Sequence, residues 1–369
     1  MSFLDGLMGI HKDPRPTTED LWQQEQDRQV RHDIRRQYED AQEIESLQEF
    51  LSRQPYYKVT LDRPRNFDEY IGQKNMKEMV IASLEACKIK KTPFPHTLFW
   101  AEAGLGKTTI AYLIAESLQA NLIITSGGQL ENKNELLNIF KQFRDDRKNI
   151  LFIDEIHSIK RKISEMIYSA MEDFRLDFTT KSDRVISLNL PPFTLIGCTT
   201  NMANLLTPIR QRFQNRFHLE PYTAADLSLI IYAYLKRSGY NNVNAEIVDE
   251  ISKRSRNVAR YAIAFMKNIL DYRLTGNKRV TVELVKEYFE KENIDSEGLN
   301  NNDRKYIALL FEMKNYKAGL NTLVKGIGID KKTVEEEIEP YLLRKRFITI
   351  GPGGRYLMEL GAQYIVMRR

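Results

Sequence analysis

Short apolar runs separated by amphipathic stretches dominate the chain from about residue 95 to residue 220. These runs lie at 98–100, 121–126, 149–153 and 193–198. The runs at 98–100 and 149–153 predict buried strands of a parallel sheet, and the other two are further strand candidates. Between the runs, apolar residues recur at three- and four-residue steps, which predicts helices. The alternation of strands and helices predicts a parallel sheet covered by helices.

One of these runs is followed by a turn that is typical of phosphate binding. After Trp100 the chain reads Ala-Glu-Ala-Gly-Leu-Gly-Lys-Thr-Thr (101–109), and a helical pattern begins at once. In a P-loop, backbone N–H groups of the loop and of the first helical turn bind the phosphates. We expect Lys107 to neutralise β- and γ-phosphate oxygens and Thr108 to ligate Mg²⁺. The predicted nucleotide-binding residues here are Gly104, Leu105, Gly106, Lys107, Thr108 and Thr109.

The match is imperfect, because the usual pattern has Gly where this chain has Ala101. An ordinary helix N-terminus is therefore an alternative for this motif alone. A second motif favours an ATPase. The run Asn149–Ile153 ends in Asp154 and Glu155. We expect Asp154 to hold the Mg²⁺ shell and Glu155 to polarise the attacking water.

Composition places the chain among globular proteins with a full core. It has 369 residues, 42% hydrophobic and 28% charged, and two or three domains are expected. No apolar run approaches the roughly 20 residues of a membrane span and no secretory signal is recognised, which favours a cytoplasmic protein. Cys87 and Cys198 lie in apolar contexts, which predicts buried free thiols.

The net charge of +5 hides an asymmetry between an N-terminal extension and the rest of the chain. Residues 1–54 carry 7 Lys and Arg against 12 Asp and Glu, whereas the remainder has a balance of +10. A basic body predicts a polyanionic partner, and the acidic extension a separate role. From Ile34 to Leu51 a narrow apolar stripe predicts a helix that covers a partner surface or this chain's own body.

Several further segments closely resemble the RuvB family, the bacterial AAA+ motors of Holliday-junction branch migration. The similarity runs from about residue 57 to the C-terminus and covers nearly the whole chain apart from the extension. It rests on the P-loop and on segments that begin at Leu61, Asp154, Ala170, Leu190 and Glu339. The resemblance implies an AAA+ domain at 55–220, a helical lid at 221–296 and a winged-helix domain at 297–369. It implies ATP and Mg²⁺ as cofactors, and Arg63, Pro64, Tyr70 and Ile71 as the adenine pocket.

The resemblance also implies roles for residues that the patterns alone leave as ordinary polar groups. Thr199, at the end of the strand 193–198, is similar to the residue that senses the γ-phosphate. Arg212, with Arg210 beside it, is similar to an arginine finger that enters the neighbouring subunit's ATP site, which implies a ring, expected to be a hexamer. Arg260 is similar to the phosphate-contacting residue of the lid, although the family's Gly and Pro are here Asn257 and Ala259.

The segment 174–189 alternates in polarity and predicts a hairpin. In the family this hairpin docks on the RuvA partner, but here its tip reads Thr180-Lys181-Ser182-Asp183 without Gly-Pro. A RuvA-like or another protein partner is expected at this hairpin or at residues 1–54.

The last domain shows three helical patterns and then a glycine-rich hairpin, which describe a winged helix. Residues 298–369 carry 13 Lys and Arg against 8 Asp and Glu, which favours nucleic-acid binding over protein docking. In the family the wing tip carries an Arg where this chain has Gly353. The remaining candidates for DNA contact are Lys345, Arg346 and Arg355.

We therefore predict an ATPase of the RuvB type that forms a ring and translocates duplex or branched DNA, encoded by a bacterium, a phage or a mobile element. The alternative is an AAA+ loader that uses ATP to place a partner protein in replication or recombination. Ala101, Glu102, Gly353 and the extension favour the loader, whereas the intact catalytic residues favour the motor.

Overall fold

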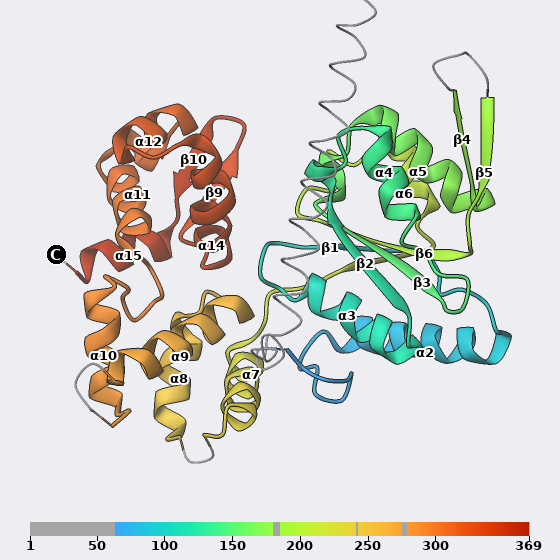
Figure 1. Cartoon of the computed structure of the whole chain (residues 1–369). Coiled ribbons are helices and arrows are strands. Elements are labelled where there is room, and N and C mark those ends of the chain that lie inside the picture. Colours follow the sequence, from blue (N-terminus) through green and yellow to red (C-terminus); the bar gives the residue numbers. More distant parts are fainter. Residues whose placement is uncertain (1–62, 180–184, 241–242, 275–278, 369) are drawn as a thin grey trace, which may run out of the picture. The chain divides into compact units, whose positions relative to one another are not determined.

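The computed structural model describes residues 63–179, 185–240, 243–274 and 279–368 (Figure 1). In this part of the chain, a five-stranded sheet of order β2-β3-β6-β1-β7 forms the centre of the first domain. All of its neighbouring strands are parallel, as predicted. The strands are β1 (Thr97–Trp100), β2 (Asn121–Ser126), β3 (Asn149–Asp154), β6 (Phe193–Thr199) and β7 (Asn215–His218). The predicted helix at 34–51 lies outside the described residues.

Helices cover both faces of this sheet, and its side chains alternate between two cores. On β3, Phe152 packs into the core that contains Val80 and Ile114, whereas its neighbour Leu151 packs into the core that contains Leu136 and Ile167. Burial on both faces explains why β1, β3 and β6 are apolar without alternation. The strand β2 lies at an edge of the sheet, where Ile123 is buried but Ile124 is exposed. The covering helices are α2 (Lys74–Lys90) and α3 (Lys107–Leu118) on the first face, and α4 (Lys133–Phe140), α5 (Arg161–Asp173) and α6 (Thr207–Arg212) on the second.

Short elements connect these layers. Two 3₁₀ turns, η1 (Gly127–Gln129) and η2 (Ile156–Ser158), follow β2 and β3. The strands β4 (Arg175–Thr179) and β5 (Val185–Asn189) pair antiparallel, which confirms the predicted hairpin. Cys87 and Cys198 are buried free thiols, as expected.

Four helices follow the sheet, in agreement with the predicted lid: α7 (Ala224–Arg237), α8 (Ala245–Arg254), α9 (Ala259–Leu274) and α10 (Val282–Lys291). Three of them begin with a side-chain cap. Thr223 and Asp226 form a capping box at α7, and Asn244 and Thr281 cap α8 and α10. Such caps satisfy N–H groups that a helix cannot satisfy internally.

The last domain contains the predicted three helical segments followed by the hairpin, and it adds the strand β8 (Lys317–Ala318) and the helix α15 (Glu359–Val366), which were not predicted. Its helices are α11 (Asn301–Glu312), α12 (Leu320–Ile327), α13 (Lys331–Thr333), α14 (Glu339–Arg344) and α15 (Glu359–Val366), with a 3₁₀ turn η3 (Lys314–Tyr316) and a π turn η4 (Val334–Ile338). Its sheet, of order β8-β10-β9, contains β8 (Lys317–Ala318), β9 (Ile348–Gly351) and β10 (Gly354–Leu357). Tyr306, Leu310 and Leu342 are fully buried at its centre.

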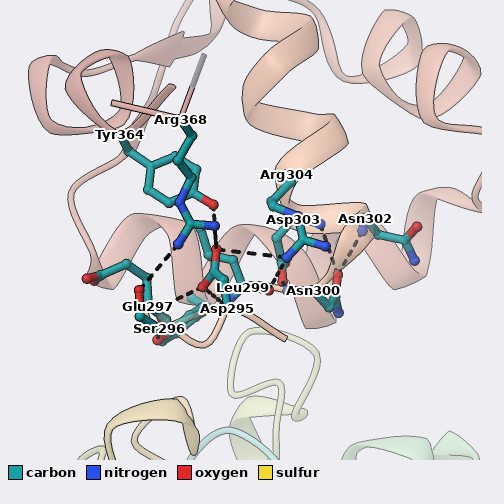
Figure 2. Close-up of polar contacts among 11 residues, drawn as sticks. Asp295, Ser296, Glu297, Leu299, Asn300, Asn302, Asp303, Arg304, Tyr364 and Arg368 are labelled. Atoms are coloured by element: carbon teal, nitrogen blue, oxygen red, sulfur yellow. Dashed lines mark hydrogen bonds and ion pairs between the residues drawn. The ribbon is translucent and has the colours of Figure 1, made fainter. Parts of the chain in front are cut away.

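The turn between α10 and α11 is built around the carboxylate of Asp295 (Figure 2). Its Oδ1 accepts from the backbone N–H groups of Glu297 and Leu299 at 2.8 and 3.0 Å. The Tyr364 hydroxyl donates to Oδ2, and Arg368 forms an ion pair with the same oxygen at 2.9 Å. These contacts tie the first turn of the domain to its last helix, α15.

The predicted domain boundaries at 220/221 and 296/297 fall between elements, just before α7 and α11. They remain predictions, and the extension at 1–54 lies outside the described residues. Among the described residues, no helix is long and apolar enough to cross a membrane.

Candidate functional site

The phosphate-binding loop lies between β1 and α3. Gly104 and Gly106 have φ of +81° and +96°, a backbone conformation that favours glycine. A Cβ at Gly104 would lie 2.6 Å from Val258, and one at Gly106 would lie 3.1 Å from the Tyr70 hydroxyl. Glycine is therefore favoured at both positions for two reasons: the backbone has a positive φ, and neighbouring side chains leave little room for a Cβ. Ala101 is buried and has no positive φ, so alanine fits where the usual pattern has glycine.

Lys107 is a buried cation at the start of α3. Its Nζ donates to the backbone oxygens of Ala101 and Glu102 at 2.7 and 2.9 Å. Burial lowers the pKa of Lys107, and the nearby carboxylates of Glu155 and Asp154 oppose this effect. A buried ammonium held only by carbonyl oxygens can exchange these partners for an anionic phosphate.

The second half of the site lies at the end of β3, beside the P-loop. Asp154 Oδ1 accepts from the backbone N–H of Glu155 at 3.0 Å. The carboxylate of Glu155 accepts from the Thr200 N–H at 3.2 Å and from its hydroxyl at 3.0 Å. His157 Nδ1 lies 3.1 Å from the same carboxylate oxygen. Glu155 has a φ of +46°, so its backbone is held in the left-handed region.

Thr200 is a residue that sequence reasoning missed. The predicted sensor, Thr199, is fully buried, and its Oγ1 lies 2.8 Å from His157 Nδ1 and accepts from the Asn201 N–H at 3.0 Å. Thr199 thus reaches Glu155 only through His157, whereas Thr200 binds the carboxylate directly. The γ-phosphate role of Thr199 stays a prediction. Thr200 could have been predicted from its position directly after β6, because β6 pairs with β3 in the sheet.

Two neighbouring cavities run along the P-loop. The larger, of about 500 Å³, contains the predicted phosphate and metal residues, and the smaller, of about 70 Å³, contains much of the predicted adenine pocket. The predicted residues that line the larger are Arg63, Gly104, Gly106, Lys107, Thr108, Thr109, Asp154, Glu155 and Arg260. Those that line the smaller are Pro64, Tyr70, Ile71, Gly106 and Thr109. Leu105, the remaining predicted loop residue, is buried in the core.

Tyr222 is a second residue that the sequence did not reveal. It lines the smaller cavity, and its hydroxyl donates to the Leu105 carbonyl at 3.3 Å and lies 3.4 Å from the Tyr70 hydroxyl. Burial raises the pKa of both tyrosines, so they are neutral at physiological pH. The two aromatic rings give the cavity an apolar surface, and their two neutral hydroxyls add groups that can form hydrogen bonds. This combination suits the binding of a planar base.

The lid reaches the P-loop through the turn before α9. Asn257 has a φ of +62°, which asparagine tolerates better than most residues. Its side chain and carbonyl bond the backbone of Tyr222 at 2.8 and 2.9 Å. Arg260 is exposed, and a Cβ at Gly104 would lie 3.0 Å from the Arg260 Cβ. The turn therefore holds without the family's Gly and Pro, and Arg260 lies beside the phosphate loop.

Arg212, at the end of α6, contacts residues of α5. Its Nη2 pairs with Glu172 Oε1 at 2.8 Å, and its guanidinium lies 4.5 Å from the centre of the Tyr168 ring. Its Nη1 donates to the Pro208 carbonyl at 3.0 Å, whereas Nε is buried without a hydrogen-bond partner among the described residues. Within one chain, Arg212 does not line the P-loop cavities. The role of Arg212 as an arginine finger therefore stays a prediction.

The three predicted DNA-contact residues differ in how free their charges are. The guanidinium of Arg355 donates to both carboxylate oxygens of Glu339, at 2.8 and 3.1 Å, and Lys345 pairs with Glu297 at 2.7 Å. Arg346 is exposed, and no ion pair joins it to a carboxylate in the described part of the chain. The charge of Arg355 is thus paired within the domain. Of the three residues, Arg346 is the one whose charge is most accessible to a DNA phosphate.

The oxygen donors of the site suit Mg²⁺. Thr108 and Asp154, which carry a hydroxyl and a carboxylate, line the same cavity as the phosphate residues. Mg²⁺ in nucleotide sites takes one or two protein oxygens and completes its shell with phosphate and water. No group of three or more His, Cys, Asp or Glu side chains capable of holding a metal occurs among the described residues, so this part of the chain offers no further metal cage.

Comparison with known protein families identifies two domains of this chain. Residues 62–219 match the family model of the "Holliday junction DNA helicase RuvB P-loop domain". Residues 296–366 match that of the "RuvB C-terminal winged helix domain". The first match covers the parallel sheet and P-loop, and the second the three-stranded wing domain.

Curated relatives and solved structures agree with these matches. The chain is 36% identical over 312 residues to "Holliday junction branch migration complex subunit RuvB" of Prochlorococcus marinus (strain MIT 9215), covering 83% of this chain and 88% of that protein. It is also 34% identical to the protein of that name from Myxococcus xanthus (strain DK1622), with 82% and 89% coverage. The structure of the Thermotoga maritima RuvB Holliday junction branch migration motor superposes with a TM-score of 0.73 at 34% identity, over 83% of this chain and 99% of that one. The chain therefore belongs to the RuvB family of Holliday junction branch migration ATPases.

Proposed function

We propose that this chain is an ATP-driven motor that assembles as a ring and moves branched DNA. The observation that carries the proposal is a single cavity lined by the P-loop, by Asp154 and Glu155, and by Arg260 of the lid. A lid residue beside the phosphate loop links the state of the nucleotide to the angle of the lid. Such a link is what a motor requires.

The chemistry follows from where charges lie in this cavity. Lys107 exchanges its carbonyl partners for β- and γ-phosphate oxygens, and the N–H groups at the start of α3 bind the same phosphates. Thr108 and Asp154 would hold Mg²⁺, which neutralises charge on the phosphates when bound. Glu155 accepts a proton from the attacking water once its carboxylate turns away from Thr200.

We further propose that the ATP site is completed between subunits. Arg212 lies apart from its own cavity, and a guanidinium brought in by a neighbour stabilises the charge that spreads over the transferred phosphoryl group. The working form is then a ring, with a hexamer as the expected size. A monomer would bind ATP but hydrolyse it poorly.

The winged-helix domains would bind the DNA. Contacts to the phosphate backbone suit a motor that must move along any sequence. A branched DNA substrate agrees with the Holliday junctions in the relatives' names. These relatives are bacterial, which supports a bacterial or phage-encoded protein. A RuvA-like partner remains a proposal for the β4–β5 hairpin, where Leu188 is exposed.

The loader hypothesis differs from the motor in what controls turnover. A loader would hydrolyse ATP in response to a protein partner, whereas the motor would respond to duplex or junction DNA. The family membership of both the P-loop and winged-helix domains favours the motor.

The test is a Glu155→Gln variant assayed on a four-way DNA junction. The amide keeps the shape of the side chain but loses the acceptor charge, so ATP binding and assembly should persist. Junction-stimulated hydrolysis should fall below about a tenth of the parent rate. Glu165→Gln makes the same chemical change on the exposed surface of α5 and should retain activity. If the rate of ATP hydrolysis by the parent chain does not change at any DNA concentration, the motor hypothesis is contradicted.

A further inference from the structure

The wing tip lacks a charged side chain of its own. The turn between β9 and β10 reads Gly351-Pro352-Gly353-Gly354, and Gly353 is exposed. Of the three cations expected nearby, Arg355 and Lys345 are paired with carboxylates. A winged helix that grips a phosphate backbone through its wing needs a free cation there, because phosphate contacts supply most of the sequence-independent affinity.

The space beside Gly353 is taken by a lysine from another strand. A Cβ at position 353 would overlap Nζ of Lys317, and it would lie 2.7 Å from Lys317 Cε and 2.5 Å from the Tyr356 hydroxyl. Glycine is thus the residue that leaves room for this lysine. The end of the Lys317 side chain lies where a side chain on the wing tip would begin.

The sheet register brings Lys317 to this place. β8 pairs antiparallel with β10, and Lys317 lies directly opposite Tyr356. The Lys317 Nζ lies 5.1 Å from the centre of the Tyr356 ring, within the range of a cation–π contact. On the ring's edge, a Cβ at Gly351 would lie 3.3 Å from Tyr356 Cε2. The wing turn and Lys317 therefore both pack on this tyrosine.

The charge of Lys317 is available to a ligand. Its side chain is exposed, and none of the carboxylates in the described ranges forms an ion pair with it. An aromatic face attracts an ammonium without using up its three N–H donors. The lysine is therefore positioned by Tyr356 but not neutralised.

We propose that Lys317, held by Tyr356 over the glycine turn of the wing, is the cation through which the wing binds the DNA phosphate backbone. The proposal rests on the proposed function, in which the winged-helix domain binds DNA. It adds a specific residue that lies on β8, outside the wing turn and outside the three cations predicted from the sequence. Arg346, exposed just before β9, would contribute a second charge.

The test measures duplex DNA affinity of the full chain across a series of salt concentrations. Lys317→Ala should weaken binding several-fold at low salt. It should also reduce the slope of log affinity against log salt by about 0.9 for each phosphate that the wing no longer binds. Lys305→Ala removes an exposed lysine of the same domain on α11 and should leave the slope unchanged. Tyr356→Phe keeps the ring and should bind like the parent, whereas Tyr356→Leu should bind like Lys317→Ala.

A rescue variant separates position from general charge. A Cβ at position 353 would meet the end of Lys317 and the Tyr356 hydroxyl, and Lys317→Ala together with Tyr356→Phe removes both obstacles. Adding Gly353→Arg to these two changes should therefore restore the slope of the parent. Equal reductions in Lys317→Ala and Lys305→Ala, or an unchanged slope in Lys317→Ala, would overturn the assignment. A parent chain whose DNA binding shows no salt dependence would instead overturn the proposed function.

Discussion

At the scale of single residues, His96 shows how a buried imidazole ties strands to a helix. Its Nδ1 accepts from the Leu195 N–H at 2.8 Å, and its Nε2 lies 3.1 Å from the Met171 carbonyl. Because the Leu195 amide can only donate, Nδ1 is unprotonated and Nε2 carries the hydrogen. Burial lowers the pKa of His96 below its usual 6.5.

This geometry predicts a pH dependence of stability. The unfolded chain gains a proton on His96 as pH falls through 6.5, whereas the folded chain resists it. The contribution of His96 to the free energy of unfolding should therefore be complete above pH 6.5. It should decrease as the pH falls below 6.5, by at most about 1.4 kcal/mol per pH unit for one group. His96→Asn keeps an acceptor and a donor without this titration. Urea unfolding from mildly acidic to mildly alkaline pH should show a shallower decline for the variant, and identical slopes would contradict the assignment.

Ala101 is the second residue whose role the structure clarifies. It is buried, its N–H donates to the Thr199 carbonyl at 3.1 Å, and its φ is not positive. Ala101→Gly should therefore relieve no strain and leave the dissociation constant for ATP within about twofold. Extra freedom in the unfolded chain should cost roughly 0.5–1 kcal/mol of stability. Nucleotide titration and thermal unfolding check both effects, and a tenfold gain in affinity would instead reveal a weakened pocket.

At the scale of elements, α6 holds Arg212 against α5. The contacts with Glu172 and Tyr168 keep the guanidinium in place before any neighbour is present. Arg212→Ala should bind ATP like the parent but lose hydrolysis by ~10³-fold or more. Arg210→Ala, on the same helix, is the matched control and should lose much less.

Mixing variants tests whether Arg212 acts between subunits. Subunits with Arg212→Ala keep Glu155, and subunits with Glu155→Gln keep Arg212. Some interfaces in a mixed ring then contain both groups, so hydrolysis should partly recover. No recovery at any mixing ratio would place the defect within one subunit.

At the scale of the whole molecule, one ion pair joins the P-loop to the winged-helix domain. Arg344 Nη1 donates to the carboxylate of Glu102, and Nη2 donates to the Arg256 carbonyl at 3.2 Å. The Glu102 carbonyl also accepts from Lys107. A change in the partners of Lys107 on nucleotide binding would therefore reach Arg344 through Glu102.

This chain of contacts predicts that the pair couples ATP binding to DNA binding. Partly exposed pairs contribute about 0–1 kcal/mol, so Arg344→Ala should change ATP affinity by less than about fivefold. It should reduce the stimulation of hydrolysis by DNA more than it reduces basal hydrolysis. Glu102→Ala should have the same effect, and the double variant should add nothing further. Fully additive effects would show that the two residues act independently.

The sequence by itself determined the features that depend on neighbours along the chain. A buried strand, a glycine turn and a helix start are contiguous at 97–118, and a strand ending in Asp154 and Glu155 is equally local. Periodicity and turn chemistry encode such units directly, so the P-loop, the parallel sheet, the β4–β5 hairpin and the wing could be predicted. The helical lid, the adenine pocket and the roles of Thr199, Arg212 and Arg260 came from family resemblance.

Only the tertiary structure decided which distant side chains meet. Tyr222 reaches Leu105 across 117 positions of the chain, and Arg344 reaches Glu102 across 242. Thr200 meets Glu155 because β6 lies beside β3, and Lys317 meets Tyr356 through the register of β8 and β10. Each of these residues is an ordinary polar or aromatic type with no local period to distinguish it. Their roles arise from packing between segments, which no window along the sequence contains.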